Sequence, residues 1–378
     1  MPEGGPAGDP DPVLTGTGDR MRWKGWEHVP LEVPDPGMPG STCAVDAIAP
    51  LIVSASRSTD IPAFYGDWLM ARLRAGYVKW KSPFGGKPVY VSFEKARLFV
   101  FWSKDPAPFM RHLDTLDREG YGCYFLYTLN NYGPEGLEPG VPSLDERIGT
   151  FIRLSRRIGK GKVVWRYDPL VLSDTVEVAT LLGRIEAVGD RIHPFCERLI
   201  FSFVDIQKYA KVKRNLERQG LSGIREFTED EVRQFCKGIA SLSRRWNLAI
   251  TACGEGRDLS AYGIGKGQCI SYDLISREFA GDRKLMDFLH SAGIAGQKTL
   301  AGAEMGGNPA RWLKDPGQRN ACGCIASKDI GQYSTCMHLC AYCYANSSPT
   351  AAAANYRRFC DDARRGIFHD SITGRDPG

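Results

Sequence analysis

Three cysteines stand close together near the end of the sequence, at Cys336, Cys340 and Cys343. Spacings of three residues and then two place three thiols on one short loop, where they can converge on one inorganic centre. A structural zinc ion takes four protein ligands, and His338 is the nearby residue that could supply the fourth. Three thiolates alone suit a four-iron cluster whose last iron stays open. The loop therefore predicts a 4Fe-4S cluster, and zinc or a disulfide framework fits less well.

Four further cysteines form a second set. Cys322 and Cys324 precede the loop as a tight pair, and Cys253 and Cys269 flank a glycine-rich stretch, Gly263 to Gly267. Four thiols supply every ligand that a four-iron cluster needs, so we expect an auxiliary 4Fe-4S cluster with no open iron. The alternative is that Cys253 and Cys269 pack as small hydrophobic side chains and that Cys322 and Cys324 bind nothing. The glycine-rich stretch lacks the P-loop spacing and is interpreted as a flexible turn.

Six short apolar runs recur from residue 50 onward, and a helical stretch separates one from the next. Continuous apolar runs are typical of parallel strands that are buried on both faces. Capping boxes at Ser143–Glu146 and Thr228–Glu231, and helical spacing from Asp60 to Gly76, indicate the intervening helices. This alternation predicts right-handed βαβ units and a (β/α) barrel. The six runs are 51–53, 98–102, 124–127, 163–165, 199–203 and 248–250.

Polar side chains follow these predicted strands at their carboxyl ends, where barrels of this kind carry their chemistry. We expect these side chains to share one mouth. Arg57 and Arg166 are the strongest candidates, because a guanidinium at the end of a buried strand needs an anionic partner. That partner is either an anionic ligand or an internal carboxylate, Asp60 or Asp168. The strand-end residues include Arg57, Lys104, Asn130, Arg166, Asp168, Ser202 and Asp205.

The cysteine loop, with Tyr342 before its last cysteine, resembles the cluster loop of the radical S-adenosylmethionine (SAM) superfamily. The wider sequence from Cys322 to Asn346, together with 56–62 and 165–169, resembles the bacterial family known as domain of unknown function 1848. This second resemblance covers nearly all of the chain after its first fifty residues. Leu339 departs from the pattern, because a glycine is expected before Cys340. The departure leaves the thiols intact and affects only the local turn.

The resemblance implies an α/β fold, a partial (β/α)6 barrel of the radical SAM type with its cluster loop at the C-terminus. It implies an enzyme in which SAM chelates the open iron and is cleaved to a 5′-deoxyadenosyl radical, which takes hydrogen from an unidentified small-molecule or peptide substrate. An external one-electron reductant of the flavodoxin or ferredoxin type is then required. The expected catalytic residues are Arg57, Lys104 and Asp168, and the expected SAM-binding residues are Tyr342, Asn130, Arg166, Ser202 and Asp205.

Two other functions remain open. The segment 340–344 also resembles the cluster loop of spore photoproduct lyase, which implies repair of nucleic acid. The basic run 208–214 suits phosphate contacts, although such a run is more often a solvated helix face. A protein of another class is a non-catalytic iron–sulfur or zinc module for electron transfer or binding.

The 378-residue chain is expected to contain one large domain with an appendage at each end. Residues 1–50 hold 9 Pro and 8 Gly, so the arm 1–49 is expected to be largely disordered or extended, with Trp23 and Trp26 pinning part of it. The barrel is expected at 50–305 and the cluster segment at 306–378, folded over the barrel mouth. Without an apolar run long enough for a membrane span, and with twelve cysteines, we expect a cytoplasmic protein.

Overall fold

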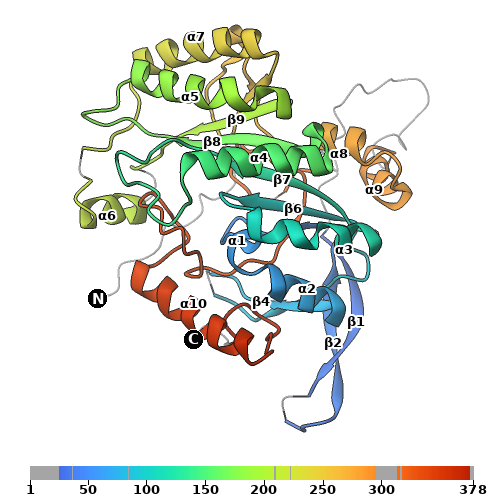
Figure 1. Ribbon diagram of the computed structural model, residues 1–378. Coiled ribbons are helices and arrows are strands. Elements are labelled where there is room, and N and C mark those ends of the chain that lie inside the picture. The colour runs from blue at the N-terminus through green and yellow to red at the C-terminus, as the bar shows by residue number, and fades with distance from the viewer. Residues whose placement is uncertain are drawn as a thin grey trace, which may run out of the picture.

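Parallel strands form the central sheet of the computed structural model, which describes residues 25–35, 37–83, 85–207, 210–221, 223–294, 313–315 and 317–374. The sheet has eight strands in this part of the chain, in the order β11-β10-β9-β8-β7-β6-β3-β12 (Figure 1). The prediction of an α/β fold with a parallel sheet is therefore confirmed. The strands are β3 (Ile52–Ser54), β6 (Leu98–Ser103), β7 (Gly122–Thr128), β8 (Val163–Leu170), β9 (Arg198–Phe203), β10 (Ala249–Ala252), β11 (Gly265–Lys266) and β12 (Lys328–Asp329).

Each of the six predicted apolar runs is a strand of this sheet, and the two outermost strands were not predicted. β11 lies within the stretch 263–267, so the interpretation of that stretch as a flexible turn is wrong. Thr251 and Ala252 of β10 pair with Gly265 and Lys266 of β11. β12 comes from the far end of the sequence and pairs in parallel with β3. Strands this short have no apolar run to mark them, so their partners decide their conformation.

The two faces of the sheet pack into two separate cores, because neighbouring side chains on a strand point to opposite faces. On β6, Phe99 and Phe101 join the larger core with the helices that connect the strands. Leu98 and Val100 face the other way and pack with side chains of α8 and α9 and with Ile325. We call the face that carries Leu98 and Val100 the inner face of the sheet. It is covered by α8, α9 and part of the C-terminal segment.

The helices begin where their sequence signals predicted. Ser143 and Glu146 form a complete capping box at α4, and Thr228 and Glu231 form another at α7. The helix predicted after Asp60 is divided at Tyr65 into α1 and α2, and α2 ends at Gly76 in a left-handed conformation. The helices are α1 (Ile61–Phe64), α2 (Gly66–Ala75), α3 (Leu113–Arg118), α4 (Leu144–Ile158), α5 (Val178–Ile192), α6 (Ala210–Arg218), α7 (Glu229–Trp246), α8 (Tyr272–Glu278), α9 (Arg283–Ile294) and α10 (Pro349–Arg364).

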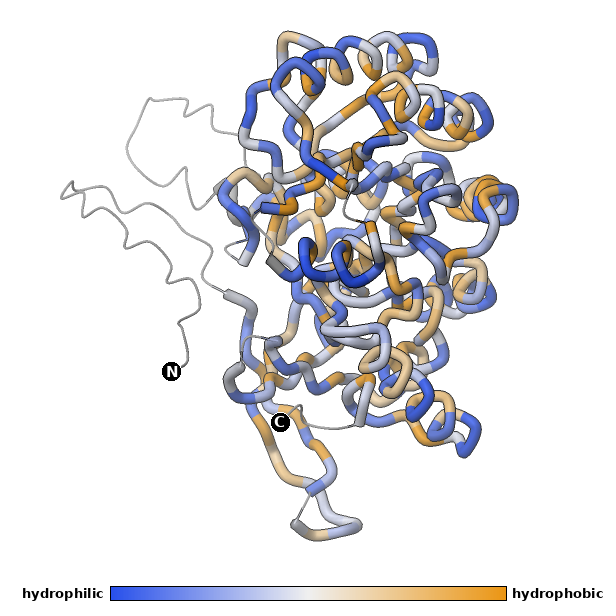
Figure 2. The backbone as a smooth tube through the Cα atoms, turned by 90° about the vertical axis from the view of Figure 1, so that its left-hand side faces the viewer, coloured by the Kyte–Doolittle hydropathy of each residue, from blue (hydrophilic) through white to orange (hydrophobic). Residues whose placement is uncertain are grey.

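A second sheet corrects the prediction for the N-terminal arm. β1 (Glu27–Pro34) and β2 (Thr42–Ala49) form an antiparallel hairpin that projects from the body (Figures 1 and 2). The hairpin continues through β5 (Val89–Ser92) to β4 (Tyr77–Trp80). These strands alternate weakly in hydrophobicity, and the prolines and glycines around them concealed the pattern.

The ends of the chain are anchored to the body by different contacts. Trp26 stacks on Phe288 of α9 with ring centroids 5.6 Å apart, as its predicted pinning role requires, whereas Trp23 lies outside the described residues. The expected boundary near residue 306 also lies outside them. In the C-terminal part, β12 is followed by the cysteine loop and α10, which lies near α2 in Figure 1. Within the described ranges, no helix has both the length and the apolar character that a membrane crossing requires.

Candidate functional site

A cavity of about 320 Å³ lies at the carboxyl end of the parallel sheet. Its wall combines the side chains that follow β3, β6, β8 and β9 with the cysteine loop. Every residue expected in the site lines this cavity except Asn130, which is buried and donates its amide N–H to Tyr342 Oη at 3.2 Å. Both sets of thiols line it, namely Cys336, Cys340 and Cys343 together with Cys253, Cys269, Cys322 and Cys324.

The cysteine loop turns sharply at Leu339, whose φ of 52° lies in the left-handed region. This is the position where the resemblance led us to expect glycine. Cys343 N donates to Cys340 O at 3.0 Å and closes the second half of the turn. Cys343 Sγ in turn accepts a hydrogen bond from Ala345 N at 3.3 Å. The loop therefore adopts a glycine-type turn with a leucine in it, at some cost in backbone strain.

The loop is held against the segment that follows β7. Gly140 N donates to His338 O at 3.0 Å, and His338 Nδ1 lies 3.1 Å from Gly140 O. A Cβ atom on Gly140 would stand 2.2 Å from Met337 O, so this close approach requires glycine. On the other side, Asn346 Nδ2 donates to Cys336 O at 2.8 Å. The segment after β7 on one side and Asn346, just beyond the loop, on the other thus fix the path of the loop.

His338 is committed to this framework through both ring nitrogens. Its Nε2 lies 2.7 Å from Asp60 Oδ2, and its Nδ1 contacts Gly140 O. Asp60 also accepts from Ala63 N at 2.9 Å, which caps α1, and from Lys104 N at 2.7 Å. In this arrangement His338 has no nitrogen left for the zinc site considered above. Among the described residues, no group of three or more His, Cys, Asp or Glu side chains is placed to hold a single metal ion.

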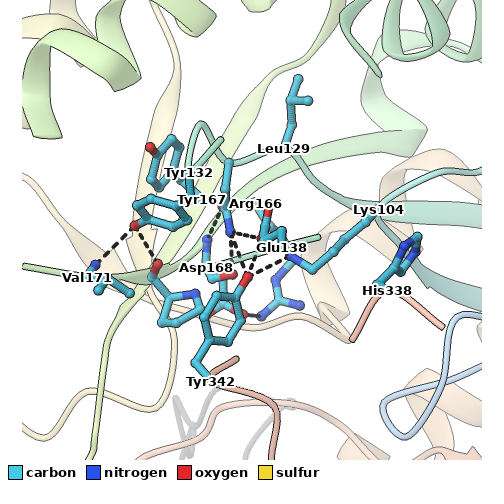
Figure 3. Close-up of polar contacts among 12 residues, drawn as sticks. Lys104, Leu129, Tyr132, Glu138, Arg166, Tyr167, Asp168, Val171, His338 and Tyr342 are labelled. Atoms are coloured by element: carbon cyan, nitrogen blue, oxygen red, sulfur yellow. Dashed lines mark hydrogen bonds and ion pairs between the residues drawn. The ribbon is translucent and has the colours of Figure 1, made fainter. Parts of the chain in front are cut away.

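Tyr342 is the centre of a buried polar network (Figure 3). Lys104 Nζ lies 2.6 Å from Glu138 Oε1 and 3.0 Å from Tyr342 Oη. Asn130 Nδ2 donates to Glu138 Oε1 at 2.8 Å, and the Tyr342 hydroxyl donates to the same carboxylate oxygen. The network joins the ends of β6 and β7 to the cysteine loop, and it orients the Tyr342 ring in the cavity wall.

The charges in this network are fixed by their neighbours. Burial favours the neutral forms of both Glu138 and Lys104. For Glu138, the positive charges of Lys104 and Arg147 outweigh burial and lower the pKa of the carboxylate. For the lysine, Glu138 and Cys340 outweigh burial and raise the pKa of Lys104. Burial, and then Glu138, raise the pKa of Tyr342 well above its ordinary value. Lys104 is therefore a permanent cation beside Cys340, which suits charge stabilisation better than proton abstraction.

Arg166 and Asp168 form the internal pair that was the alternative to an anionic ligand. Arg166 Nη2 lies 2.6 Å from Asp168 Oδ2, and Ser202 Oγ donates to the other oxygen of this carboxylate. Arg166 Nε is buried without a hydrogen-bond partner among the described residues. The pair therefore satisfies part of the guanidinium and leaves one donor uncommitted.

Arg57 also has a carboxylate partner, but neither of the two proposed from the sequence. Its Nη1 lies 3.4 Å from Asp315 Oδ2, and its Nη2 donates to Ser327 Oγ at 3.2 Å. The guanidinium lies over the Trp102 ring at 5.1 Å from the centroid. Asp315 and Ser327 belong to the C-terminal segment, so Arg57 ties this segment to the end of β3.

The second set of thiols forms a compact group. Cys253 Sγ lies 3.6 Å from Cys269 Sγ, and Cys324 Sγ accepts a hydrogen bond from Ile270 N at 3.4 Å. Hydrogen bonds within the group lower the pKa of Cys253 and of Cys324, and the same bonds raise the pKa of Cys269 and of Cys322. Four thiols that come from three separate segments therefore meet at one place, and two of them favour the thiolate.

Asp205 lies at the rim of the cavity, where its Oδ2 is 3.9 Å from Arg319 Nη1. Helix α6 covers the neighbouring edge. Val212 lines the cavity, and Asn215 Nδ2 donates to Cys343 O at 3.0 Å. The first two residues of the basic run, 208 and 209, lie outside the described residues, and the rest of the run forms the start of α6.

Two functional candidates were missed from the sequence, Glu138 and Asp315. Glu138 lies in a loop rich in glycine and proline that follows the end of β7, so its position after a strand was an available signal. Asp315 is followed by Pro316 and Gly317, a pattern that indicates only a turn. Its pairing with Arg57 depends on the tertiary structure.

The comparisons with known proteins give one result. A family model described as Domain of unknown function (DUF1848) matches residues 52–345. The match covers most of the chain, including the central sheet and all seven cavity cysteines. No curated protein and no solved structure matches.

Proposed function

The chain belongs to the family described as domain of unknown function (DUF1848), and on this premise we propose that it is a radical SAM enzyme whose reaction takes place in the cavity. The observation that carries the proposal is the placement of Cys336, Cys340 and Cys343. Three thiols of one loop line the same cavity as the strand-end side chains, while both nitrogens of the nearby His338 are already engaged.

The donor set fits an open-iron cluster. Three buried or half-buried thiols on one loop suit a 4Fe-4S cluster whose fourth iron accepts SAM. The four thiols of Cys253, Cys269, Cys322 and Cys324 suit a fully ligated auxiliary cluster. Held by Cys336, Cys340 and Cys343, such a cluster would supply the one-electron reductive cleavage of SAM to methionine and a 5′-deoxyadenosyl radical able to take hydrogen from the substrate, with the electron coming from an external carrier of the flavodoxin or ferredoxin type.

The chain's own residues orient the reactants and exclude water. Lys104 supplies a fixed positive charge beside the loop, and the Glu138 network holds the Tyr342 ring toward the cavity. Asn130 is a further SAM-binding candidate because it is bonded to Tyr342 Oη. Asp168 is held by Arg166 and Ser202, so its carboxylate presents a defined orientation. In this proposal the parallel sheet is the incomplete (β/α)6 barrel of radical SAM enzymes.

Ser202, at the end of β9, and Asp205 beyond it also line the wall. They complete the proposed SAM-binding set. The substrate, a small molecule or peptide, would occupy the space between the two thiol sets. A reducing, cytoplasmic compartment suits this chemistry, because every cysteine is free and seven line the cavity.

The decisive test is anaerobic reconstitution of the wild-type protein and of the Cys336→Ala, Cys340→Ala and Cys343→Ala variants, with SAM and a reductant. The wild type should release 5′-deoxyadenosine, and each variant should release essentially none, because the remaining two thiols cannot hold the cluster. Cys123→Ala is the matched control. Burial raises the pKa of Cys123 to about 12, and this thiol lies on β7 outside the cavity.

Two results would reject the proposal. One is release near the wild-type level in all three variants. The other is a wild-type protein that contains iron and sulfide but forms no 5′-deoxyadenosine. A colourless preparation purified without oxygen and loaded with zinc would favour the non-catalytic metal module.

Iron counting tests the auxiliary cluster separately. Two four-iron clusters require about eight irons per chain. Cys322→Ala should lower the content by about half while the spectrum still changes on adding SAM, because the open-iron cluster is separate. A wild-type content of about four irons that Cys322→Ala does not change would show that the second cluster is absent.

The alternative of nucleic-acid repair draws support from α6, because Lys213, Arg214 and Arg218 are exposed beside the cavity. Phosphate contacts release counterions, so binding of single-stranded or duplex DNA should then weaken steeply as salt increases. DNA affinity that is negligible, or equal at low and high salt, would exclude this version.

A further inference from the structure

Two arginines, the half-buried Arg57 and the buried Arg166, lie beside the four-thiol group. Arg57 follows β3, and Arg166 lies on β8, so they approach the cavity from strands that are separated by β6 and β7. Both side chains line the same cavity as Cys253, Cys269, Cys322 and Cys324. Each arginine has a carboxylate partner, yet neither pair accounts for the whole guanidinium.

Arg57 is fixed on the Cys324 side. Asp315 and Ser327 hold two of its nitrogens, and Trp102 supports its plane. Asp315 N donates to Cys324 O at 2.9 Å, so the residue that orients Arg57 is also paired with the backbone of a thiol ligand. The guanidinium is thus positioned with respect to Cys324 by a short chain of contacts.

Arg166 is fixed on the Cys253 side. Its Nη2 is bonded to Asp168, and its buried Nε has no partner among the described residues. Cys253 N donates to Phe201 O on β9, the strand next to β8, at 2.7 Å. A buried N–H donor that has no partner is costly unless a bound group accepts from it.

The electrostatics agree with this placement. Burial disfavours the charge of Arg57, but Cys324, Asp329 and Asp315 outweigh it and raise the pKa of Arg57. Burial also disfavours the charge of Arg166, but Asp168, Cys269 and Cys253 outweigh it and raise the pKa of Arg166.

We propose that Arg57 and Arg166 are positioning residues for the four-thiol group, where they balance its negative charge, and that they bind neither SAM nor substrate. This inference rests on the proposed metal centre at these thiols. A four-thiolate iron–sulfur cluster is anionic, and its reduced form carries one more negative charge than its oxidised form. Nearby positive charge stabilises the reduced form more and raises the reduction potential.

The experiment uses the full-length chain with Cys336, Cys340 and Cys343 all changed to Ser, so that only the four-thiol group can hold a cluster. The reduction potential is measured by a redox titration followed by electron paramagnetic resonance. Arg57→Gln and Arg166→Gln should each shift it to more negative values. We expect about a tenfold change in the ratio of reduced to oxidised cluster at a fixed potential, about 59 mV for one electron.

Three further variants separate charge from structural damage. Arg166→Lys keeps the charge and should restore part of the shift. Asp315→Asn removes a negative charge beside Arg57 and should move the potential in the opposite direction, which a loosened structure would not do. Arg184→Gln is the matched control, because Arg184 forms a half-buried pair with Glu135 at 2.7 Å but does not line the cavity.

The outcomes are distinct. If the triple-Ser protein holds no iron, the auxiliary cluster of the proposed function is wrong. If it holds zinc, the readout becomes zinc affinity in competition with a chelator, which both Gln variants should weaken about tenfold. Unchanged potential, or unchanged zinc affinity, in both Gln variants at full metal content would overturn the role of the arginines. If a Gln variant loses its metal, the Asp315→Asn variant decides the question. A shift of its reduction potential to more negative values would also overturn the role of the arginines.

Discussion

Leu339 shows how a single residue can be at odds with the turn that it occupies. Its φ is 52°, a conformation in which a residue with a side chain costs about 1–2 kcal/mol relative to the right-handed region. The half-buried leucine side chain repays part of that cost by packing. The thiols on either side remain in the cavity wall, so the strain has not displaced them.

Replacing Leu339 by glycine should relieve this strain. Because glycine also gains freedom in the unfolded chain, the net gain is smaller than the strain itself. Both Leu339→Gly and Leu339→Ala lose the packing of the leucine side chain, but only glycine removes the backbone strain. We therefore expect the free energy of unfolding of Leu339→Gly to exceed that of Leu339→Ala by about 0.5–1 kcal/mol. Urea denaturation of the two metal-free proteins measures the difference. Equal stability of the two variants would contradict the strain.

Lys104 is informative at the same scale. The sequence suggested a catalytic lysine, and the structure surrounds its ammonium with Glu138 and Tyr342. Glu138→Gln should loosen Tyr342 and leave Lys104 with an incompletely balanced buried charge. We expect a loss of about 3–5 kcal/mol in unfolding free energy, because a buried ion pair is broken on one side. Glu135→Gln, which breaks the half-buried Arg184 pair away from the cavity, controls for the loss of a paired carboxylate.

Among the larger elements, the docking of the cysteine loop on the segment after β7 is the critical contact. It depends on the absence of a side chain at Gly140, whose missing Cβ makes room for Met337 O. The same segment carries Glu138, so its position determines both the path of the loop and the orientation of Tyr342. The geometry of the site is therefore set by a loop that contributes no cysteine itself.

Gly140→Ala should displace the cysteine loop, at a cost of about 1–3 kcal/mol for overpacking. Iron content after reconstitution should fall by about half, because the four-thiol group is held by other segments. Gly133→Ala in the same loop is the matched control, since its added Cβ meets nothing within 4 Å. Equal iron content in the two variants would argue against the role of this contact.

At the scale of the whole molecule, the C-terminal segment adds a strand to the central sheet and covers part of its inner face. β12 pairs with β3, and Ile325 packs on the inner face of the sheet together with α8 and α9. Cys322 and Cys324 of this segment meet Cys253 and Cys269 of the preceding region. The cavity is thus built from both ends of the sequence.

A chain that ends at Gly306 should therefore fail to fold into a soluble protein. Removing the later residues exposes the inner core and leaves β3 as an unprotected edge strand. Expression of residues 25–306 alone, followed by size-exclusion chromatography, measures this. A soluble, monomeric product, together with SAM cleavage by the isolated segment 307–378, would show instead that the segment is an independent unit.

The local features were determined by the sequence alone. The six apolar runs became strands, and the boxes at Ser143 and Thr228 became helix starts. These features depend on residues a few positions apart, whose spacing can be read directly. The three thiols of the cysteine loop are likewise a local feature. Cys336 and Cys343 are only seven positions apart, so the thiols stay together wherever the loop lies.

The tertiary structure decided what depends on distant residues. Arg57 pairs with Asp315, 258 positions away, in place of the nearer Asp60, whose oxygens are taken by His338 and the start of α1. The hairpin β1–β2 acquired its conformation by joining β5, and Glu138 gained its partners from three segments. Burial makes such choices sharp, because an unpaired charge or strand edge inside the protein is costly, and only the folded chain shows which partners come within reach.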